Sequence, residues 1–374
     1  MTTHEKVDFD VAVVGGGLGG LVLSHLLTDS GFSVAVFEKK RYPFHRVCGE
    51  YISNEVIPFL QRNDLFPQEL APSTIKKFQL TSISGNSLEM PLDLGGFGIG
   101  RYAFDHWLAK KLTAKKASLF EGTTIRNIEK RGGTYCIQAS DDSTYLAKLA
   151  VGSYGKRSSI DKKLDRPFLK KQSPYIGVKY HIETDFDDST VALHNFRGGY
   201  CGINKIEGNK YNLCYLSERK NLKKSGTIAK MESDILSENP HLNKIWKEAH
   251  FLFDKPEVIN EISFEKKGAL FNDIPMVGDA AGMITPLCGN GMAMAIHSAS
   301  ILAQIIQKYP DEQEVINRTY QAEWSSAFSS RLWAGRKIQG LFGGGRSSNF
   351  AVRLGQQIRP AAQFLMSKTH GQVF

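Results

Sequence analysis

The sequence predicts a two-domain α/β protein in which a parallel sheet is joined to a second, mostly antiparallel sheet. Residues 9–37 show a strand, a glycine turn, a helix and another strand, which is the pattern of a βαβ unit. After residue 167, four strand-like runs are separated by turn residues, which is typical of an antiparallel sheet. From residue 265 a strand, a glycine turn and a long helix follow, so we expect the chain to return to its first domain.

Each element has a local signal. Residues 9–14 and 33–37 are short β-branched runs, and apolar residues recur at helical intervals between Leu18 and Leu27. Residues 41–100 contain five prolines, so we expect mainly loops there, with one short helix over 54–62. Further predicted helices cover 102–117, 225–237, 291–308 and much of the last 65 residues, with a break at 343–345. Further predicted strands cover 118–130, 134–139, 149–153, 176–184, 190–195, 200–205 and 211–217.

These elements set the expected domain boundaries. We place the first domain in residues 1–75, 100–166 and 265–310, so that it is discontinuous, and the second domain in residues 76–99 and 167–264. Residues 311–374 form a C-terminal helical segment. No repeat with a period of 20 to 50 residues is visible, which excludes solenoids and propellers.

Composition limits the classes of protein. The 374 residues are 41% apolar and 23% charged, which is enough to bury a core, and the net charge is +9. This basic balance favours an anionic substrate, an acidic carrier protein or an anionic lipid surface, and we expect no nucleic-acid partner. The five cysteines show no C-x-x-C spacing, and no run of about 18 apolar residues occurs, so we expect a reduced, cytoplasmic protein without a transmembrane segment.

The first strand ends in a glycine-rich turn that suits a dinucleotide. Gly15, Gly17 and Gly20 fit G-x-G-x-x-G, which gives a tight turn, close backbone approach to a pyrophosphate and close helix packing. Glu38 follows at the end of the second strand, where a carboxylate holds ribose hydroxyls. A Rossmann-like domain is therefore expected. The alternative is a glycine-rich turn without a ligand.

A second glycine-rich segment follows the late strand. Gly278 and Asp279 lie in its turn, where a carboxylate can bind a polyol, and the long helix begins a few residues later. The start of that helix offers backbone N–H groups and a positive dipole end to an electron-rich ring such as a reduced flavin, and its residues are Pro286, Gly289, Asn290, Gly291 and Met292. The alternative is an ordinary strand-to-helix loop with capping residues.

Over residues 8–310 the sequence resembles the flavoprotein group of p-hydroxybenzoate hydroxylase, flavin-dependent halogenases and geranylgeranyl reductases. The segments that carry the resemblance are GGGLGG with Glu38, YPFHRVCGE at 42–50, Arg101 in GRYAFDHWL, and GDAAGMITPLCGNGM at 278–292. The resemblance implies a GR2-type fold that binds extended FAD. It places Glu38 on the adenosine ribose, Arg46 and Arg101 near the pyrophosphate and ribityl chain, Asp279 on the ribityl or pyrophosphate, and residues 289–292 beside the isoalloxazine. It adds Lys39, Val47, Cys48 and Ile125 as FAD contacts.

The sequence departs from this group in two places. Residues 152–158 read GSYGKRS, without the Asp-Gly pair that hydroxylases associate with FAD and with the nicotinamide donor, so the mode of NAD(P)H use stays open. Lys156 and Arg157 in this loop are expected to be solvated. Residues 199–204 lack both tryptophans of the halogenase Trp-x-Trp-x-Ile-Pro segment, and only Tyr200 and Gly208 match the aromatic segment of the reductases.

Cys48 is the candidate catalytic residue, because RVCGE is similar to the Cys-Gly segment of the reductase branch. A neighbouring Arg46 and a flavin lower a thiol pKa, although a free cysteine is more often a small buried apolar residue. His45 is expected to face solvent. No HExxH, no metal-spaced histidine cluster and no G-x-S-x-G occurs, so we expect no metal and no serine acyl transfer.

We therefore expect an FAD- and NAD(P)H-dependent monooxygenase acting on an aromatic, polyketide-like or lipid-like small molecule of secondary metabolism. The alternatives are a reductase of carbon–carbon double bonds, a halogenase, or a flavin-binding module without catalysis. Two groups of basic residues are candidates for docking an acidic carrier or an anionic lipid, although solvated loop charges are an equal alternative. They are Lys162, Lys163, Arg166, Lys170 and Lys171, and then Lys220, Lys223 and Lys224.

Overall fold

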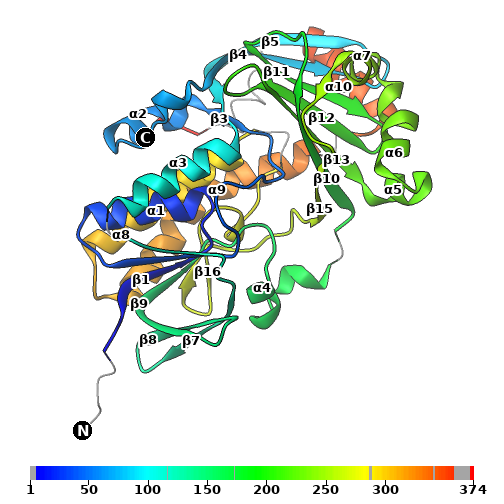
Figure 1. Ribbon diagram of the computed structural model, residues 1–374. Coiled ribbons are helices and arrows are strands. Elements are labelled where there is room, and N and C mark those ends of the chain that lie inside the picture. Colours follow the sequence, from blue (N-terminus) through cyan, green and yellow to red (C-terminus); the bar gives the residue numbers. More distant parts are fainter. Residues whose placement is uncertain (1–5, 116, 172, 286–288, 340–341, 358–370) are drawn as a thin grey trace.

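The protein is built on two sheets that lie at opposite ends of the molecule (Figure 1). The structure is a computed structural model and describes residues 6–115, 117–171, 173–285, 289–339, 342–357 and 371–374. Among these residues, no helix is long and apolar enough to cross a membrane.

The first sheet has the strand order β6-β2-β1-β9-β8-β7. Its strands are β1 (Phe9–Val14), β2 (Val34–Glu38), β6 (Ser118–Glu121), β7 (Ile125–Arg131), β8 (Thr134–Ala139) and β9 (Thr144–Gly152). Strand β1 pairs in parallel with β2 and β9, which confirms the predicted βαβ unit. Its helix α1 (Leu18–Asp29) ends before Gly31, whose φ of 88° few other residues adopt.

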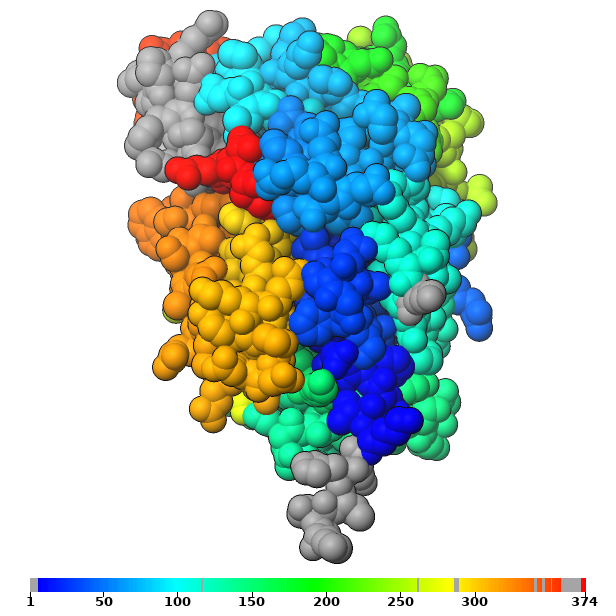
Figure 2. All heavy atoms as spheres, turned by 90° about the vertical axis from the view of Figure 1, so that its left-hand side faces the viewer, coloured from blue at the N-terminus to red at the C-terminus, as the bar shows by residue number. Residues whose placement is uncertain are grey.

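Helix α1 packs against α8 (Gly291–Lys308), so the two glycine-rich segments of the sequence belong to one domain. Figures 1 and 2 both show the beginning of the chain, in blue, beside the residues near 300, in yellow-orange. Helix α3 (Arg101–Thr113) also packs on α1. The remaining elements around this domain are α4 (Ser159–Lys163), η3 (Pro167–Lys170), β16 (Leu270–Phe271), β17 (Ile274–Pro275) and η5 (Gly278–Ala280).

The second sheet has the order β14-β10-β13-β12-β11-β4-β5-β3, with β15 also paired to β10. Its strands are β3 (Tyr51–Ser53), β4 (Ser73–Thr81), β5 (Ser87–Gly98), β10 (Tyr175–Glu183), β11 (Thr190–Phe196), β12 (Gly199–Lys205), β13 (Tyr211–Glu218), β14 (His250–Phe251) and β15 (Glu257–Ile262). The four predicted strands from β10 to β13 are confirmed. All the strand pairs are antiparallel except β11 with β4.

Strands β4 and β5 correct the expectation that loops dominate residues 41–100. Neither strand alternates cleanly between apolar and polar residues: β4 carries Lys76 and Lys77, and β5 contains Pro91 and a glycine-rich end. The two strands nevertheless pair with each other, and the register shifts between Ile75 and Lys77, next to Pro91. These two strands form because they pair with each other across the hairpin, and local propensity does not reveal such pairing.

Helices cover one face of the second sheet. These are α5 (Arg219–Ser225), α6 (Ile228–Asp234), η4 (Leu236–Glu238) and α7 (Pro240–Glu248). The predicted helix over 225–237 is therefore wrong in its bounds, because Gly226, with a φ of 82°, separates α5 from α6. The apolar core here includes Val178, Leu213 and Met231.

The C-terminal segment is helical, as predicted, in its described residues. Helix α9 (Gln313–Gln339) packs on α8, and α10 (Gly345–Gln357) packs on β4 and β5. Near the chain's end, the Phe374 ring lies against Phe59, 5.2 Å between centroids, in α2 (Ile57–Arg62). Two 3-10 turns, η1 (Asn54–Val56) and η2 (Gln68–Leu70), flank α2, and η1 with α2 confirms the short helix predicted there.

Candidate functional site

The glycine turn lies at the carboxyl end of β1, where ligands bind in parallel sheets. Gly15 has a φ of 110°, and a Cβ there would lie 2.3 Å from the Ser153 carbonyl oxygen. A Cβ at Gly20 would lie 2.2 Å from the Gly15 carbonyl oxygen, so α1 packs closely only with glycine. Gly17 differs, because a Cβ there would meet nothing nearer than the Arg101 guanidinium at 3.8 Å. Its position beside open space leaves room for a ligand to approach the backbone.

Glu38 ends β2 and is almost fully buried beside this turn. Its Oε2 accepts a hydrogen bond from the Gly16 N–H at 3.1 Å and forms an ion pair with Arg46 at 2.9 Å. Arg46 also approaches Asp105 at 3.3 Å, and Asp105 holds Arg101 by two contacts of 2.6 Å. The structure therefore brings three predicted site residues, Glu38, Arg46 and Arg101, to the open side of the turn.

This arrangement fits a dinucleotide. The Arg46 guanidinium, 29% exposed, lies beside this turn, and no side chain caps the N-terminus of α1 at Gly17. A guanidinium beside a positive helix end suits a pyrophosphate. Of the other expected contacts, Lys39 is exposed just after Glu38, and Ile125 is buried at the start of β7.

The second glycine segment lies on the same side of the sheet. Asp279 sits in η5 after Gly278, whose φ is 61°, and its carboxylate makes no hydrogen bond or ion pair with any described residue. The neighbouring Lys267 donates hydrogen bonds to the carbonyl oxygens of Asp279 and Lys156, and burial lowers the pKa of Lys267 to about 8. A free carboxylate beside a buried cation suits the polar chain of a cofactor.

The start of α8 contains two glycines, Gly289 and Gly291. Gly291 is its first residue, no side-chain hydrogen bond caps the helix N-terminus at Asn290, and Met292 is buried. Gly289 has a φ of 65°, and a Cβ there would meet the Tyr51 ring at 2.7 Å. Pro286, also predicted as a contact, lies outside the described residues.

The loop after β2 runs between the two sheets. The Val47 carbonyl accepts a hydrogen bond from Lys156 Nζ at 3.1 Å, and Gly177 of β10 leaves room for the Val47 side chain. The Gly49 carbonyl accepts a hydrogen bond from Asn212 of β13 at 2.9 Å. Cys48 is half-buried between these two contacts. Cys48, the predicted catalytic residue, thus lies where the loop after β2 meets the second sheet.

A buried ionic group that the sequence analysis missed joins the same loop to the second sheet. Glu50, Lys179 and His181 are almost inaccessible to solvent, and Glu50 binds Lys179 Nζ at 2.5 Å and His181 Nε2 at 2.7 Å. Glu50 also accepts the Arg101 N–H at 2.7 Å. Burial alone raises the pKa of Glu50, but Lys179 and His181 outweigh it and hold the pKa at about 2. The alternation that places Lys179 and His181 on one face of β10 was the only available signal, and it does not reveal Glu50 as their partner.

His45 does not face solvent as expected. Its ring is half-buried and lies 4.5 Å from the Tyr102 ring and 4.6 Å from the Phe253 ring, measured between centroids. Burial, together with the nearby Lys179 and His181, lowers the pKa of His45 to about 4. Packing of an aromatic ring against other rings explains the difference.

Arg166 corrects the expected docking surface. Only 1% of the residue is exposed, because it binds Asp161 at 3.0 Å and the Ala280 carbonyl at 3.0 Å. Lys170 pairs with Asp165 and Lys171 with Glu265. The first basic cluster is therefore a set of exposed lysines, partly neutralised, around a buried arginine.

One face of the second sheet is apolar and turns toward α10. Leu193, Tyr200 and Leu216 are buried here with Met283 and with Val352 of α10. A cavity of about 320 Å³ adjoins this face. Its lining includes Tyr175, Ile262, Phe264, Thr285 and Arg336. This cavity lies next to the segment that precedes α8.

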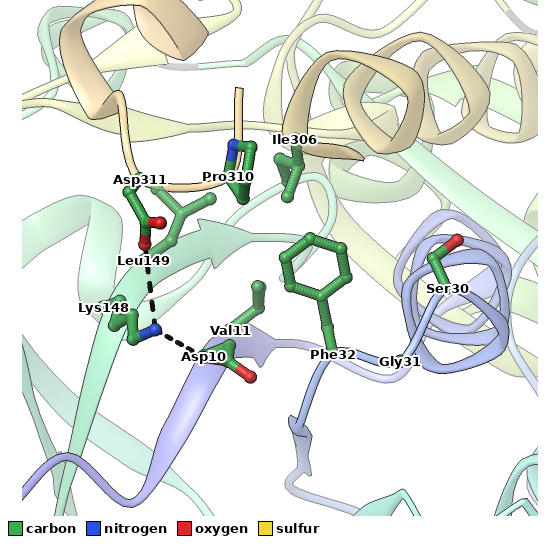
Figure 3. A pocket seen from close by; sticks show the side chains of 10 residues that line it. All are labelled: Asp10, Val11, Ser30, Gly31, Phe32, Lys148, Leu149, Ile306, Pro310 and Asp311. Carbon is green, nitrogen blue, oxygen red and sulfur yellow. Dashed lines mark ion pairs between the residues drawn. The ribbon is translucent and has the colours of Figure 1, made fainter. Parts of the chain in front are cut away.

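A second cavity, of about 220 Å³, lies in the first domain near the amino end of β1. Figure 3 shows Lys148 between Asp10 and Asp311, with which it forms ion pairs of 2.9 and 3.8 Å. Asp10 lies near the amino end of β1, away from the glycine turn. The cavity is therefore far from the glycine turn, and the charged residues that line it are paired with one another. It is a poor candidate for the cofactor site.

Curated proteins of similar sequence include enzymes and a receptor. The chain is 23% identical over 354 residues to "Conditioned medium factor receptor 1" of Dictyostelium discoideum, covering 86% of this chain and 68% of the relative. It is 24% identical over 364 residues to "Digeranylgeranylglycerophospholipid reductase 2" of Methanopyrus kandleri, covering 90% and 87%. It is 23% identical over 345 residues to "FAD-dependent monooxygenase paxM" of Penicillium paxilli, covering 81% and 70%.

Solved structures share the fold. The flavin-dependent brominase Bmp2 superposes with a TM-score of 0.77 at 17% identity, covering 96% of this chain and 93% of the brominase. A geranylgeranyl bacteriochlorophyll reductase-like protein from Thermoplasma acidophilum superposes with a TM-score of 0.75 at 17% identity, covering 92% and 91%. Residues 8–326 match the FAD binding domain family. The chain therefore belongs to this family, the p-hydroxybenzoate hydroxylase-like flavoproteins, and is an FAD-dependent oxidoreductase.

Proposed function

We propose that the chain is a monooxygenase that uses NAD(P)H as reductant and acts on an apolar aromatic, polyketide-like or lipid-like molecule. The observation that carries this proposal is the cavity of about 320 Å³ lined by Tyr175, Ile262 and Phe264, which adjoins the apolar face of the second sheet next to the segment that precedes α8. When bound, reduced FAD supplies the electrons that activate O₂. The side chains on this face exclude water, which oxygen transfer from a flavin requires.

In this proposal FAD lies along the glycine turn. Glu38 binds the adenosine ribose, Arg46 and Arg101 bind the pyrophosphate, Asp279 binds the ribityl chain, and residues 289–292 meet the ring. Three observations support this: the Arg46 guanidinium beside the uncapped start of α1, the carboxylate of Asp279 with no partner among the described residues, and the start of α8, which no side-chain hydrogen bond caps. Lys39, Val47, Cys48, Pro286 and Ile125 complete the proposed set of contacts.

Reduction of a carbon–carbon double bond is the second candidate. Cys48 favours it, because a half-buried thiol on the cofactor loop can give a proton to the carbon that does not receive the hydride. Relatives named as digeranylgeranylglycerophospholipid reductases are similar to the chain over most of its length. Halogenation and flavin binding without turnover have no comparable observation in the described site.

Isotope labelling separates these reactions. The purified protein, NADPH or NADH, and a panel of phenols, polyketides and isoprenoid lipids are incubated under ¹⁸O₂, and the products are analysed by mass spectrometry. A product with one ¹⁸O atom supports the monooxygenase. A product with two added hydrogens and no ¹⁸O, lost in Cys48→Ala, contradicts it and supports the reductase. If neither nicotinamide reduces the flavin in the presence of any panel member, the assignment of NAD(P)H as reductant is wrong.

A further inference from the structure

The end of the chain has an unusual charge distribution. After Glu323 the sequence contains seven Lys and Arg residues and no Asp or Glu, so most of the net charge of +9 arises there. A stretch of one sign attracts an oppositely charged surface and repels a similar one. The described part of this stretch is the second half of α9, then α10, and residues 371–374.

The same helices carry the most exposed large apolar side chains among the described residues. Trp333 of α9 is 60% exposed and Phe350 of α10 is 62% exposed. Leu354 lies one turn beyond Phe350 and is 36% exposed, whereas Val352, on the other side of α10, is fully buried against the second sheet. Trp333, Phe350 and Leu354 therefore point away from the core. Packing within this chain does not explain their exposed apolar surface.

Basic side chains surround these apolar residues. Arg336 and Lys337 follow Trp333 by about one helical turn, and Arg353 lies between Phe350 and Leu354. All three are exposed, and none forms an ion pair with a described residue. Lys337 Nζ lies 5.9 Å from the centroid of the Trp333 ring. Their charges are thus not neutralised within the described chain, in contrast to Lys170 and Lys171.

We propose that the exposed side chains of α9 and α10, which we call together the C-terminal basic surface, dock on an anionic lipid bilayer. It consists of Trp333, Arg336, Lys337, Phe350, Arg353 and Leu354. Tryptophan, phenylalanine and leucine enter the boundary between headgroups and acyl chains, while lysine and arginine bind anionic headgroups. Protein interfaces also bury aromatic rings and arginines, so a wild type that fails to bind phosphatidylglycerol vesicles would favour an acidic protein instead.

The surface adjoins a cavity. Arg336 also lines the cavity of about 320 Å³ that contains Tyr175, Phe264 and Thr285. A bilayer that binds Arg336 would therefore lie beside this cavity, whose lining also includes Thr285 before α8. Docking itself does not depend on which reaction the flavin carries out.

The test is sedimentation of the full-length, FAD-loaded protein with vesicles. One set of vesicles contains phosphatidylglycerol and phosphatidylcholine, and the other contains phosphatidylcholine alone. The test variant is Arg336→Gln/Lys337→Gln/Arg353→Gln. The matched control is Lys162→Gln/Lys163→Gln/Lys170→Gln, which removes the same charge from exposed residues whose neighbourhood, residues 159–171, has no exposed large apolar side chain.

We expect the wild type and the control to bind phosphatidylglycerol vesicles, and the test variant to bind on the order of 100-fold more weakly, since each basic residue near an anionic surface contributes about fivefold. Binding should also fall at 1 M salt. Flavin absorbance and melting temperature should match in all three proteins. Failure of the wild type to bind, equal weakening by both triple variants, or equal binding to neutral vesicles would each overturn the proposal.

A second readout tests the apolar part. Trp333 fluorescence should shift to shorter wavelength on phosphatidylglycerol vesicles, and Trp333→Phe should abolish most of that shift while it keeps most of the binding. Trp333→Ser/Phe350→Ser should weaken binding without changing its salt dependence. An unshifted spectrum for the bound wild type would show that the aromatic rings stay in water and would contradict insertion.

Discussion

Removing the Lys179 ammonium should destabilise the protein strongly, because it leaves the Glu50 carboxylate in a site without solvent. Both side chains are fully buried, and their atoms are 2.5 Å apart. Breaking a buried ion pair from one side costs about 3–5 kcal/mol. His181 and the Arg101 N–H still contact Glu50, so we expect a loss near 3 kcal/mol in the free energy of unfolding of Lys179→Met. With a denaturant slope of about 3 kcal/mol/M, the urea midpoint should fall by about 1 M.

A charge-neutral double variant isolates the cause. Glu50→Gln/Lys179→Met removes both charges, and glutamine keeps an acceptor for the Arg101 N–H. Apolar replacement of a whole buried pair is often neutral, so the double variant should recover most of the lost midpoint. A single variant with the wild-type midpoint, or a double variant as unstable as the sum of both single variants, would refute the reasoning.

The same group predicts an acid dependence. Lys179 and His181 hold the pKa of Glu50 at about 2, below its ordinary value of 4.5. Because the folded pKa is the lower one, the contribution to stability is complete above pH 4.5 and is lost as the pH falls toward 2. The shift corresponds to ~3 kcal/mol. The loss of stability over this range should be smaller in Lys179→Met than in the wild type.

Five further variants test the cofactor site and the core. Glu38→Ala should weaken FAD binding by roughly 10- to 100-fold, the effect of losing a charged hydrogen bond, and flavin titration measures it; a colourless wild type that binds FMN equally well would contradict the adenosine assignment. Asp279→Ala should lose flavin while the apoprotein keeps its melting temperature; early melting with wild-type affinity would make Asp279 structural. Gly17→Ala should fold but bind FAD poorly, whereas Gly20→Ala, whose Cβ would meet the Gly15 carbonyl oxygen at 2.2 Å, should fail to fold, as circular dichroism and absorbance would show. Burial lowers the pKa of His25 to about 4 from 6.5, so its contribution to stability is complete above pH 6.5 and disappears toward pH 4; His25→Gln should flatten urea midpoints over that range, and an unchanged slope would contradict this.

Glu50 connects the first domain to the second sheet. Its carboxylate contacts the start of α3 in the first domain and β10 in the second sheet, and its carbonyl accepts a hydrogen bond from Asn204 of β12 at 3.3 Å. The cofactor loop that contains Cys48 is thus fixed from both sides. A change in this group should alter flavin binding and stability together, which distinguishes it from Glu38.

The βαβ unit, the two glycine-rich segments and the strands from β10 to β13 could be predicted from the sequence. Their signals are local: Gly15, Gly17 and Gly20 lie within six residues, and the start of α8 follows Asp279 by twelve. The FAD binding family follows from such short segments, because a phosphate needs a glycine turn and a helix start in immediate succession. The expected return of residues 265–310 to the first domain agrees with the packing of α1 on α8.

Residues whose partners are distant in the chain could not be placed before the folded structure was known. Glu50 meets Lys179 and His181 across 129 and 131 residues, and no spacing rule connects them. Arg166 reads as a surface charge in the sequence, but folding buries it against Asp161 and Ala280. Strands β4 and β5 form because each completes the other's hydrogen bonds. In each case the decisive free energy comes from a desolvated contact or a strand pairing that exists only after the chain has folded.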